Sequence, residues 1–367
     1  MHMPGKSSQK GTAKKIAVVE GDGIGPEIIH EAKKILAVVQ EFSSIRFEFM
    51  DSPAGGGVYK KTGSSLPDAS LKVMEQSDAI LYGAIGLPDL PQGVAEIAVL
   101  KIRQHFDEYV NLRPVKLFET AKDMCPLKDK FVGTGIDMII VRENTESLYA
   151  KIGGQLRDDV AANLMLYTKS GVDRIIKYAF ELAKKTPTHA KVTSVDKANI
   201  LACSQMWRER FHEIAKQYAS IKTEDFYVDA FCQWLIRKPY ECKIVVTENM
   251  FGDIVSDEAA YLLGSLGMAP SGNINPNGIS MYEPIHGSAP DIAGKGIANP
   301  IGTILAAKLM LSETFKENAI AQAIEDAVEQ SLLKGRTPDV AKEGIPTLTT
   351  VQMGDLIAGE LKKLLKK

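Results

Sequence analysis

Short runs of apolar residues alternate along this chain with longer stretches of helical periodicity. The apolar runs predict buried strands at about 15–20, 79–83, 138–141, 191–195 and 243–247. The clearest helical patterns cover about 27–39, 170–185 and 199–218. Because strands alternate with helices, we predict an α/β fold with a largely parallel sheet. A chain of 367 residues is long enough for about two domains.

A glycine-rich turn, 21–27, follows the first predicted strand. Its third glycine comes one residue too early for the G-x-G-x-x-G pattern of dinucleotide-binding proteins. We therefore predict a tight turn with positive φ angles before a helix, and a fold that is not of the Rossmann type.

Composition excludes several classes of partner. A net charge of −2 offers no electrostatic attraction for nucleic acid or an anionic membrane. No apolar run approaches the ~20 residues that span a bilayer, and the first fifteen residues lack the apolar core of a signal peptide. The four cysteines show no CxxC spacing, which predicts reduced thiols. Together these features predict a cytoplasmic protein without nucleic-acid or membrane partners.

Two aspartates suggest a metal site. Asp253 and Asp257 are four residues apart in a predicted helix, so their carboxylates leave one face, one turn apart. A hard cation such as Mg²⁺ or Mn²⁺ would relieve their repulsion. A third carboxylate, Asp229, ends a short extended run. The alternative is a solvated acidic helix start favoured by the helix dipole.

Basic and phenolic side chains supply the complementary half of a site. Arg103 lies in a predicted helix, Arg113 follows Asn111, and Arg142 directly follows the strand at 138–141. Guanidinium groups bind carboxylates through paired hydrogen bonds, although each could instead form an ordinary surface ion pair.

Two further residues could transfer protons. Lys197 follows a predicted strand and could act as a base. The phenol of Tyr149 could give or take a proton. The alternatives are a solvated lysine and a half-buried tyrosine.

The segment 283–300 is dense in glycine, proline and small residues and has no helical or strand period. Three prolines would interrupt any regular series of backbone hydrogen bonds in this segment: Pro284, Pro290 and Pro300. A loop of this kind inside a compact chain predicts backbone held close to a ligand.

These motifs, in this order and spacing, resemble the β-decarboxylating dehydrogenases, the family of isocitrate and isopropylmalate dehydrogenases. The resemblance covers about residue 15 to beyond 310. It implies a cofactor-side domain from 1–108 plus 264–367 and a dimerisation and metal domain at 109–263. It also implies a homodimer with shared active sites. The polar segment at about 151–170, which we expect to be irregular, resembles the interlocking arm of such dimers, and a plain surface excursion is the alternative.

The resemblance assigns roles to the candidate residues. Three arginines would hold the carboxylates of a 2-hydroxy dicarboxylate substrate: Arg103, Arg113 and Arg142. Three carboxylates would hold Mg²⁺ or Mn²⁺: Asp253, Asp257 and, from the second subunit, Asp229. Lys197 of the second subunit would take the hydroxyl proton, and Tyr149 would protonate the enolate left by decarboxylation.

The resemblance also places the nicotinamide cofactor in the loop at 283–300. Its contacts would be Glu283, His286, Gly287, Ser288, Ala289, Asp291 and Asn299. A carboxylate at Asp291 can accept hydrogen bonds from a ribose 2′-hydroxyl but repels a 2′-phosphate, so NAD is expected rather than NADP.

The helix before Arg103 bears on the substrate. By the resemblance, Val99 and Leu100 would occupy the positions that face the substrate's side group, and an apolar pair favours an alkyl group. The alternative is that both residues belong to the hydrophobic core. Glu96 matches a glutamate beside the nicotinamide in isopropylmalate enzymes. We therefore expect NAD-dependent conversion of 3-isopropylmalate to 4-methyl-2-oxopentanoate, a step of leucine biosynthesis.

Other substrates stay open. The segment 143–149 resembles that of the isocitrate and the D-malate/tartrate enzymes. D-malate or tartrate is therefore the alternative substrate, followed by isocitrate or homoisocitrate. A further alternative is a catalytically silent regulatory subunit. In such a subunit we would expect the lysine, the tyrosine or the aspartates to be replaced, whereas all of them are present.

Overall fold

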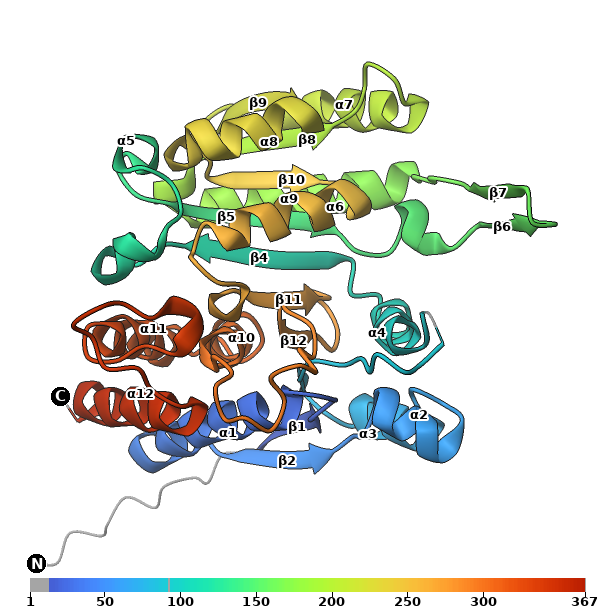
Figure 1. Ribbon diagram of the computed structural model, residues 1–367. Coiled ribbons are helices and arrows are strands. Elements are labelled where there is room, and N and C mark those ends of the chain that lie inside the picture. Colours follow the sequence, from blue (N-terminus) through green and yellow to red (C-terminus); the bar gives the residue numbers. More distant parts are fainter. Residues whose placement is uncertain (1–12, 92, 367) are drawn as a thin grey trace, which may run out of the picture.

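The computed structural model describes residues 13–91 and 93–366, so most of the polar N-terminal stretch lies outside the described residues. A ten-stranded sheet runs through the molecule in the order β2-β1-β3-β12-β11-β4-β5-β10-β8-β9 (Figure 1). Its strands are β1 (Lys14–Val19), β2 (Phe47–Asp51), β3 (Ala79–Tyr82), β4 (Val110–Lys116), β5 (Asp137–Glu143), β8 (Lys191–Asp196), β9 (Lys222–Tyr227), β10 (Ile244–Thr247), β11 (Pro270–Ile274) and β12 (Met281–Pro284).

Most neighbouring strands are parallel, which confirms the predicted α/β fold with a largely parallel sheet. Antiparallel pairing is confined to the middle of the sheet, where β12, β11, β4 and β5 are neighbours. The helix of the sequence motif at 249–257 follows one strand of this sheet, and the loop at 283–300 follows another.

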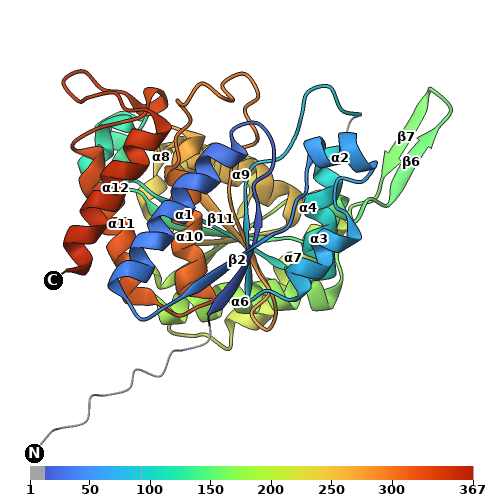
Figure 2. The same cartoon turned by 90° about the horizontal axis from the view of Figure 1, so that it is seen from below.

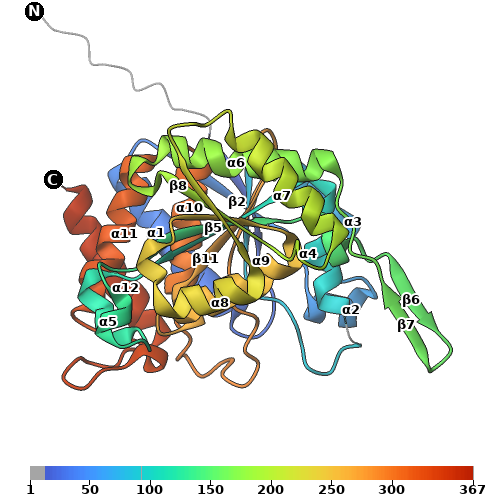
Figure 3. The same cartoon turned by 90° about the horizontal axis from the view of Figure 1, so that it is seen from above.

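Helices cover both faces of the sheet. They are α1 (Gly25–Phe42), α2 (Gly56–Thr62), α3 (Asp68–Glu75), α4 (Val94–His105), α5 (Asp129–Val132), α6 (Lys169–Lys185), α7 (Ala202–Ala215), α8 (Val228–Arg237), α9 (Asn249–Tyr261), α10 (Ile301–Glu313), α11 (Asn318–Leu332) and α12 (Thr350–Leu365). Short 3₁₀ helices lie at η1 (Glu119–Met124), η2 (Ser147–Ala150), η3 (Pro187–His189), η4 (Pro239–Glu241), η5 (Leu266–Met268) and η6 (Pro338–Val340). Figure 2 shows α1, α10, α11 and α12 on one side of the sheet and α2, α3 and α4 on the other. At the opposite end, α6 and α7 lie across the strands from α8 and α9 (Figure 3).

The glycine-rich turn after β1 has the predicted backbone. Gly21 and Gly23 adopt φ angles of +80° and +57°. A Cβ atom on Gly23 would lie 2.0 Å from the carbonyl oxygen of Ser288, so only glycine fits there. The next residue, Ile24, donates its N–H to that same carbonyl over 2.9 Å. The turn therefore fixes the distant loop at 283–300.

Two predictions for irregular backbone need correction. Glu283 and Pro284 belong to β12, where Pro284 pairs with Pro270 at the end of the strand. Proline has no backbone N–H to donate, but at a strand end this does not interrupt the other hydrogen bonds of the sheet. The segment at 151–170 contains a two-stranded ribbon, β6 (Gly153–Leu156) and β7 (Val160–Asn163), whose residues are all exposed. It projects from the body of the molecule (Figure 1).

The cysteines form no disulfide, in agreement with the sequence prediction. Burial raises the pKa of the Cys232 thiol to about 11 and that of Cys242 to about 12. Among the residues described, no helix is both long and apolar enough to cross a membrane.

A buried arginine joins η1 to the segment after α11. The guanidinium of Arg336 is 1% exposed and donates to both carboxylate oxygens of Asp123, at 2.7 and 3.1 Å. This hydrogen bonding holds the pKa of Asp123 at about 2, below its usual 3.8.

Replacement of this carboxylate should show a defined pH dependence. Because the folded pKa is depressed, the pair stabilises the protein at neutral pH, and this contribution is lost as the pH falls from about 4 toward about 2. We expect Asp123→Asn to lower the urea midpoint at pH 7 and the difference from the parent to narrow below pH 4. A difference independent of pH would contradict this account.

Candidate functional site

The central antiparallel strands carry polar side chains on one face. Residues two apart on a strand share a face, as Asn111 and Arg113 do on β4. The strand register aligns further polar residues with them: Glu283 lies opposite Ser271, Asn273 opposite Asn111, and Asn111 opposite Arg142. The interior of the sheet thus has one strongly polar region.

A cavity of about 300 Å³ is bordered by this region. The predicted site residues that line it are Glu96, Val99, Leu100, Arg103, Arg113, Arg142, Tyr149, Asp253, Glu283, His286 and Gly287. The predicted site residues outside its lining are Lys197, Asp229, Asp257, Ser288, Ala289, Asp291 and Asn299. Most of the predicted substrate-contacting groups therefore meet at one place.

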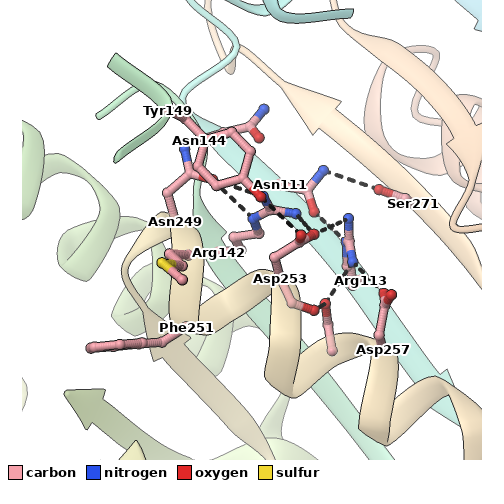
Figure 4. Close-up of polar contacts among 12 residues, drawn as sticks. Asn111, Arg113, Arg142, Asn144, Tyr149, Asn249, Phe251, Asp253, Asp257 and Ser271 are labelled. Atoms are coloured by element: carbon pink, nitrogen blue, oxygen red, sulfur yellow. Dashed lines mark hydrogen bonds and ion pairs between the residues drawn. The ribbon is translucent and has the colours of Figure 1, made fainter. Parts of the chain in front are cut away.

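Two arginines bind the paired aspartates of α9 directly (Figure 4). Asp253 accepts hydrogen bonds from Arg142, from Arg113 at 3.4 Å and from the hydroxyl of Tyr149 at 2.9 Å. Arg113 also donates to Asp257 at 3.2 Å. The spacing of the two carboxylates predicted a cation between them, and in this structure the Arg113 guanidinium bridges them.

The protonation states in this cluster follow from burial and charge. Burial alone would raise the pKa of Asp253, but Arg142 and Arg113 outweigh it and hold the pKa below its ordinary value. Burial and the neighbouring Arg142 lower the pKa of Arg113 to about 10. Burial raises the pKa of Tyr149. At neutral pH the cluster therefore has an anionic Asp253, a cationic Arg113 and a protonated Tyr149.

Lys197 and Asp229 bond each other. The Lys197 ammonium donates to the Asp229 carboxylate over 2.6 Å, at the ends of β8 and β9. Asp229 is 67% exposed and shares no cluster with Asp253. In the described part of the chain, no group of three or more His, Cys, Asp or Glu side chains could hold a metal. One copy of the chain thus brings two of the three predicted carboxylates together on α9, and of these Asp253 lines the cavity.

Helix α4 forms the wall that contains both apolar and cationic side chains. The apolar side chains of Val99 and Leu100 line the cavity, and Arg103 lies on the same helix. The Nε atom of Arg103 is buried and has no hydrogen-bond partner among the described residues. A buried donor without a partner is costly, which suits this arginine to an anionic ligand.

The loop after β12 offers a free acceptor. The Nδ1 atom of His286 lies 2.9 Å from the carbonyl of Gly287, which makes Nδ1 the donor and leaves Nε2 as an acceptor. Nε2 is buried without a partner among the described residues, and desolvation lowers the pKa of the ring. A neutral imidazole with an unused acceptor fits an amino-bearing heterocycle such as adenine.

The other predicted cofactor residues frame that loop. Ser288 donates its hydroxyl to the carbonyl of Gly86 at 2.7 Å, and Ala289 adopts a positive φ of 41°. Asp291 is exposed. Asn299 donates to Asp339 at 3.0 Å. These residues shape and border the loop, and their contacts with a cofactor stay a prediction.

Known proteins with similar sequence and structure are numerous. The sequence model of a family described as isocitrate/isopropylmalate dehydrogenase matches residues 15–357. A 3-isopropylmalate dehydrogenase of Aquifex aeolicus is 43% identical over 359 residues, which are 95% of this chain and 98% of that protein. An isocitrate dehydrogenase structure from Methylococcus capsulatus has a TM-score of 0.85 and 35% identity, covering 95% and 99% of the two chains. A β-decarboxylating dehydrogenase structure from Thermococcus kodakarensis has a TM-score of 0.79 and 35% identity, covering 96% and 97%.

The sequence argument missed Asp22, which holds the cavity wall in place. Its carboxylate is 7% exposed and accepts three backbone N–H groups, from Gly56 at 2.6 Å, Gly57 at 2.8 Å and Gly86 at 2.9 Å. It thereby joins the start of α2 to the strand-end loop beside the cavity. Its position within the glycine-rich turn was the available signal, since an aspartate there can bond backbone N–H groups.

Asp22→Asn should destabilise the protein. An amide presents only one acceptor oxygen, so at least one buried N–H loses its partner, at a cost of about 1–3 kcal/mol. The measurement is the free energy of unfolding in urea. The control is Asp78→Asn. The exposed Asp78 accepts a single backbone N–H, from Lys15 at 2.7 Å, which the one amide oxygen of asparagine can still accept, so this variant should cost at most about 0.5 kcal/mol. Equal losses for the two variants would refute the special role of Asp22.

Proposed function

The chain belongs to the isocitrate/isopropylmalate dehydrogenase family, and from this membership and the cavity we propose that it oxidatively decarboxylates 3-isopropylmalate with NAD and a divalent cation. The choice of substrate rests on the part of the cavity wall that helix α4 forms. Val99 and Leu100 give the cavity an apolar side next to three buried arginines. A third carboxylate, as in isocitrate, would meet no partner in the side chains of Val99 and Leu100, and Arg103 is assigned to the two carboxylates of the malate part.

The proposed roles follow from the charges already described. Arg103, Arg113 and Arg142 bind the two carboxylates of the substrate and fix its orientation. Tyr149, protonated at neutral pH, delivers a proton to the carbon that loses CO₂. Lys197 of a second copy of the chain would accept the proton of the substrate hydroxyl as the neutral amine, the form that a nearby divalent cation favours.

The residues present fit the two groups that the reaction needs. Asp253 and Asp257 offer hard oxygen ligands one helical turn apart, and Asp229 of a second copy would complete the cation site. Glu283, His286 and the loop to Asn299 would hold NAD, with Asp291 beside the adenosine ribose. When bound, NAD supplies the hydride acceptor and the cation supplies the electron-withdrawing centre for decarboxylation.

Surface features support a homodimer. The ribbon β6–β7 is exposed on both strands, including Leu156 and Val160, and an isolated two-stranded ribbon is marginally stable in water. Ile254 and Tyr261 of α9 are also more than half exposed. By this proposal a second copy buries these apolar side chains and contributes its Lys197 and Asp229 to the partner's cavity. By this proposal the cofactor-side domain comprises 1–108 and 264–367, and the segment 109–263 forms the dimerisation domain.

A substrate panel tests the function. We expect NADH formation with Mg²⁺ to have its highest kcat/KM on 3-isopropylmalate, ahead of D-malate, tartrate and isocitrate, and NAD to be preferred to NADP. The control is Lys197→Met, which should retain the parent's thermal stability but lose turnover. Absence of turnover by the parent on every acid would overturn the proposed activity, and a preference for D-malate would overturn the proposed substrate.

Mixing of inactive subunits tests the shared site. Lys197→Met and Tyr149→Phe should each abolish turnover. By the proposal, however, each active site takes Tyr149 from one subunit and Lys197 from the other. Random exchange of subunits should therefore restore activity, up to about a quarter of the parent's, because half of the dimers would be hybrids with one intact site. No recovery, despite proven subunit exchange, would show that both residues serve the same chain's site.

A further inference from the structure

Asn273 occupies the centre of a buried hydrogen-bond network behind the cavity. Its side chain is fully buried. Its Nδ2 atom donates to Glu283 at 2.7 Å, and its Oδ1 atom accepts from Asn111 at 2.7 Å and from Asn144 at 3.0 Å. Asn273 itself does not line the cavity.

The network ends on two of the arginines that do line the cavity. The carboxylate oxygen of Glu283 that accepts from Asn273 also accepts from Arg103, at 3.2 Å. On the other side, the Oδ1 atom of Asn111 accepts from the Nε atom of Arg113 at 2.6 Å. Arg103 comes from α4 and Arg113 from β4. Two guanidinium groups carry the same charge and have only donors, so they cannot bond each other and their spacing depends on the groups between them.

We propose that Asn273 is a positioning residue that holds Arg103 and Arg113 at the separation that a dicarboxylate substrate requires. It acts through Glu283 on one side and Asn111 on the other. The proposal rests on the function proposed above, because it assigns both arginines to substrate carboxylates. A diacid bound through two guanidinium groups depends on their spacing, and small misplacements weaken such binding.

An amide is the side chain that this position needs. Glu283 presents an acceptor, whereas Asn111 and Asn144 present donors, so the central group must donate on one side and accept on the other. An ionised carboxylate would face the carboxylate of Glu283. An alkyl group would leave several buried polar groups unpaired.

The surrounding charges reinforce this requirement. Glu108 is also fully buried, close enough to Arg103 and Glu283 to interact with both, and burial raises its pKa. A further negative charge at position 273 would therefore lie in a desolvated region that already contains the carboxyl groups of Glu108 and Glu283. The arginines that could offset this charge are already bonded to Glu283 and Asn111.

Asn273→Asp tests the proposal through its pH dependence. When ionised, the new carboxylate cannot donate to Glu283. When protonated, it has one donor and one acceptor, like the amide. Burial beside Glu283 raises the folded-state pKa of the new acid, so the defect is present at high pH and diminishes as the pH falls through that pKa. We expect KM for 3-isopropylmalate to rise about tenfold at pH 8, with a smaller change in kcat, and the ratio to the parent to approach one toward pH 6.

Asn275→Asp is the matched control. Asn275 follows the same strand and donates to the carbonyl of Phe106 at 2.8 Å, so this variant makes the same chemical change without a bond to either arginine's partner. Its KM ratio to the parent should be near one and independent of pH. The proposal is overturned if N273D has the parent's KM at every pH, or if N275D reproduces its pH-dependent rise.

Two further measurements cover the remaining outcomes. If N273D does not fold at pH 8, Asn273→Ser is measured instead. The shorter serine hydroxyl cannot reach both Glu283 and Asn111, so KM should rise about threefold or more at every pH. An unchanged KM would reject the proposal. If the parent turns over no diacid, the proposed function fails, and the network is tested alone by urea unfolding. The stability deficit of N273D must then shrink between pH 8 and pH 6, and a constant deficit would reject it.

Discussion

Neutralisation of buried guanidinium groups is the constraint on which the site depends. Arg142 is 1% exposed and Arg113 is 5% exposed, and such charges are stable in the interior only with anionic or amide oxygens around them. Asp253 supplies the shared anion, so helix α9 must begin immediately after β10. The side chain of Glu248 makes this start possible, because it accepts the N–H groups of Met250 and Phe251 at the helix N-terminus.

Features that depend on local sequence were predictable. The alternation of apolar runs with helical periods indicated the largely parallel sheet, and the four-residue spacing of Asp253 and Asp257 placed both on one face of α9. The glycines at 21 and 23 have the positive φ angles that their turn required. Arg103 lies on a helix, as its sequence context suggested. Each of these follows from spacing within a few residues.

Features that depend on which strands become neighbours were not predictable. Asn111 was visible in its motif, but its bond to Asn273 exists because β11 lies between β12 and β4 in antiparallel register, and no local pattern specifies this order. The three backbone bonds of Asp22 likewise join segments distant in sequence. The ribbon at β6–β7 was expected as an irregular arm because its residues are exposed on both faces and so show no burial pattern.

The contact between Gly23 and Ser288 also has a kinetic meaning. It ties a turn made near the start of the chain to a loop made near its end, and the Ile24–Ser288 hydrogen bond spans most of the polypeptide. Closing such a loop carries an entropic cost that must be met before the contact contributes any stability, so contacts of this kind slow folding. A chain emerging from the ribosome can pair β1 with β2 early, yet it lacks Ser288 until most of the polypeptide has been made. By the proposed function, NAD binding at the loop 283–300 is therefore acquired late, and it would report that segments distant in the sequence have reached their native arrangement.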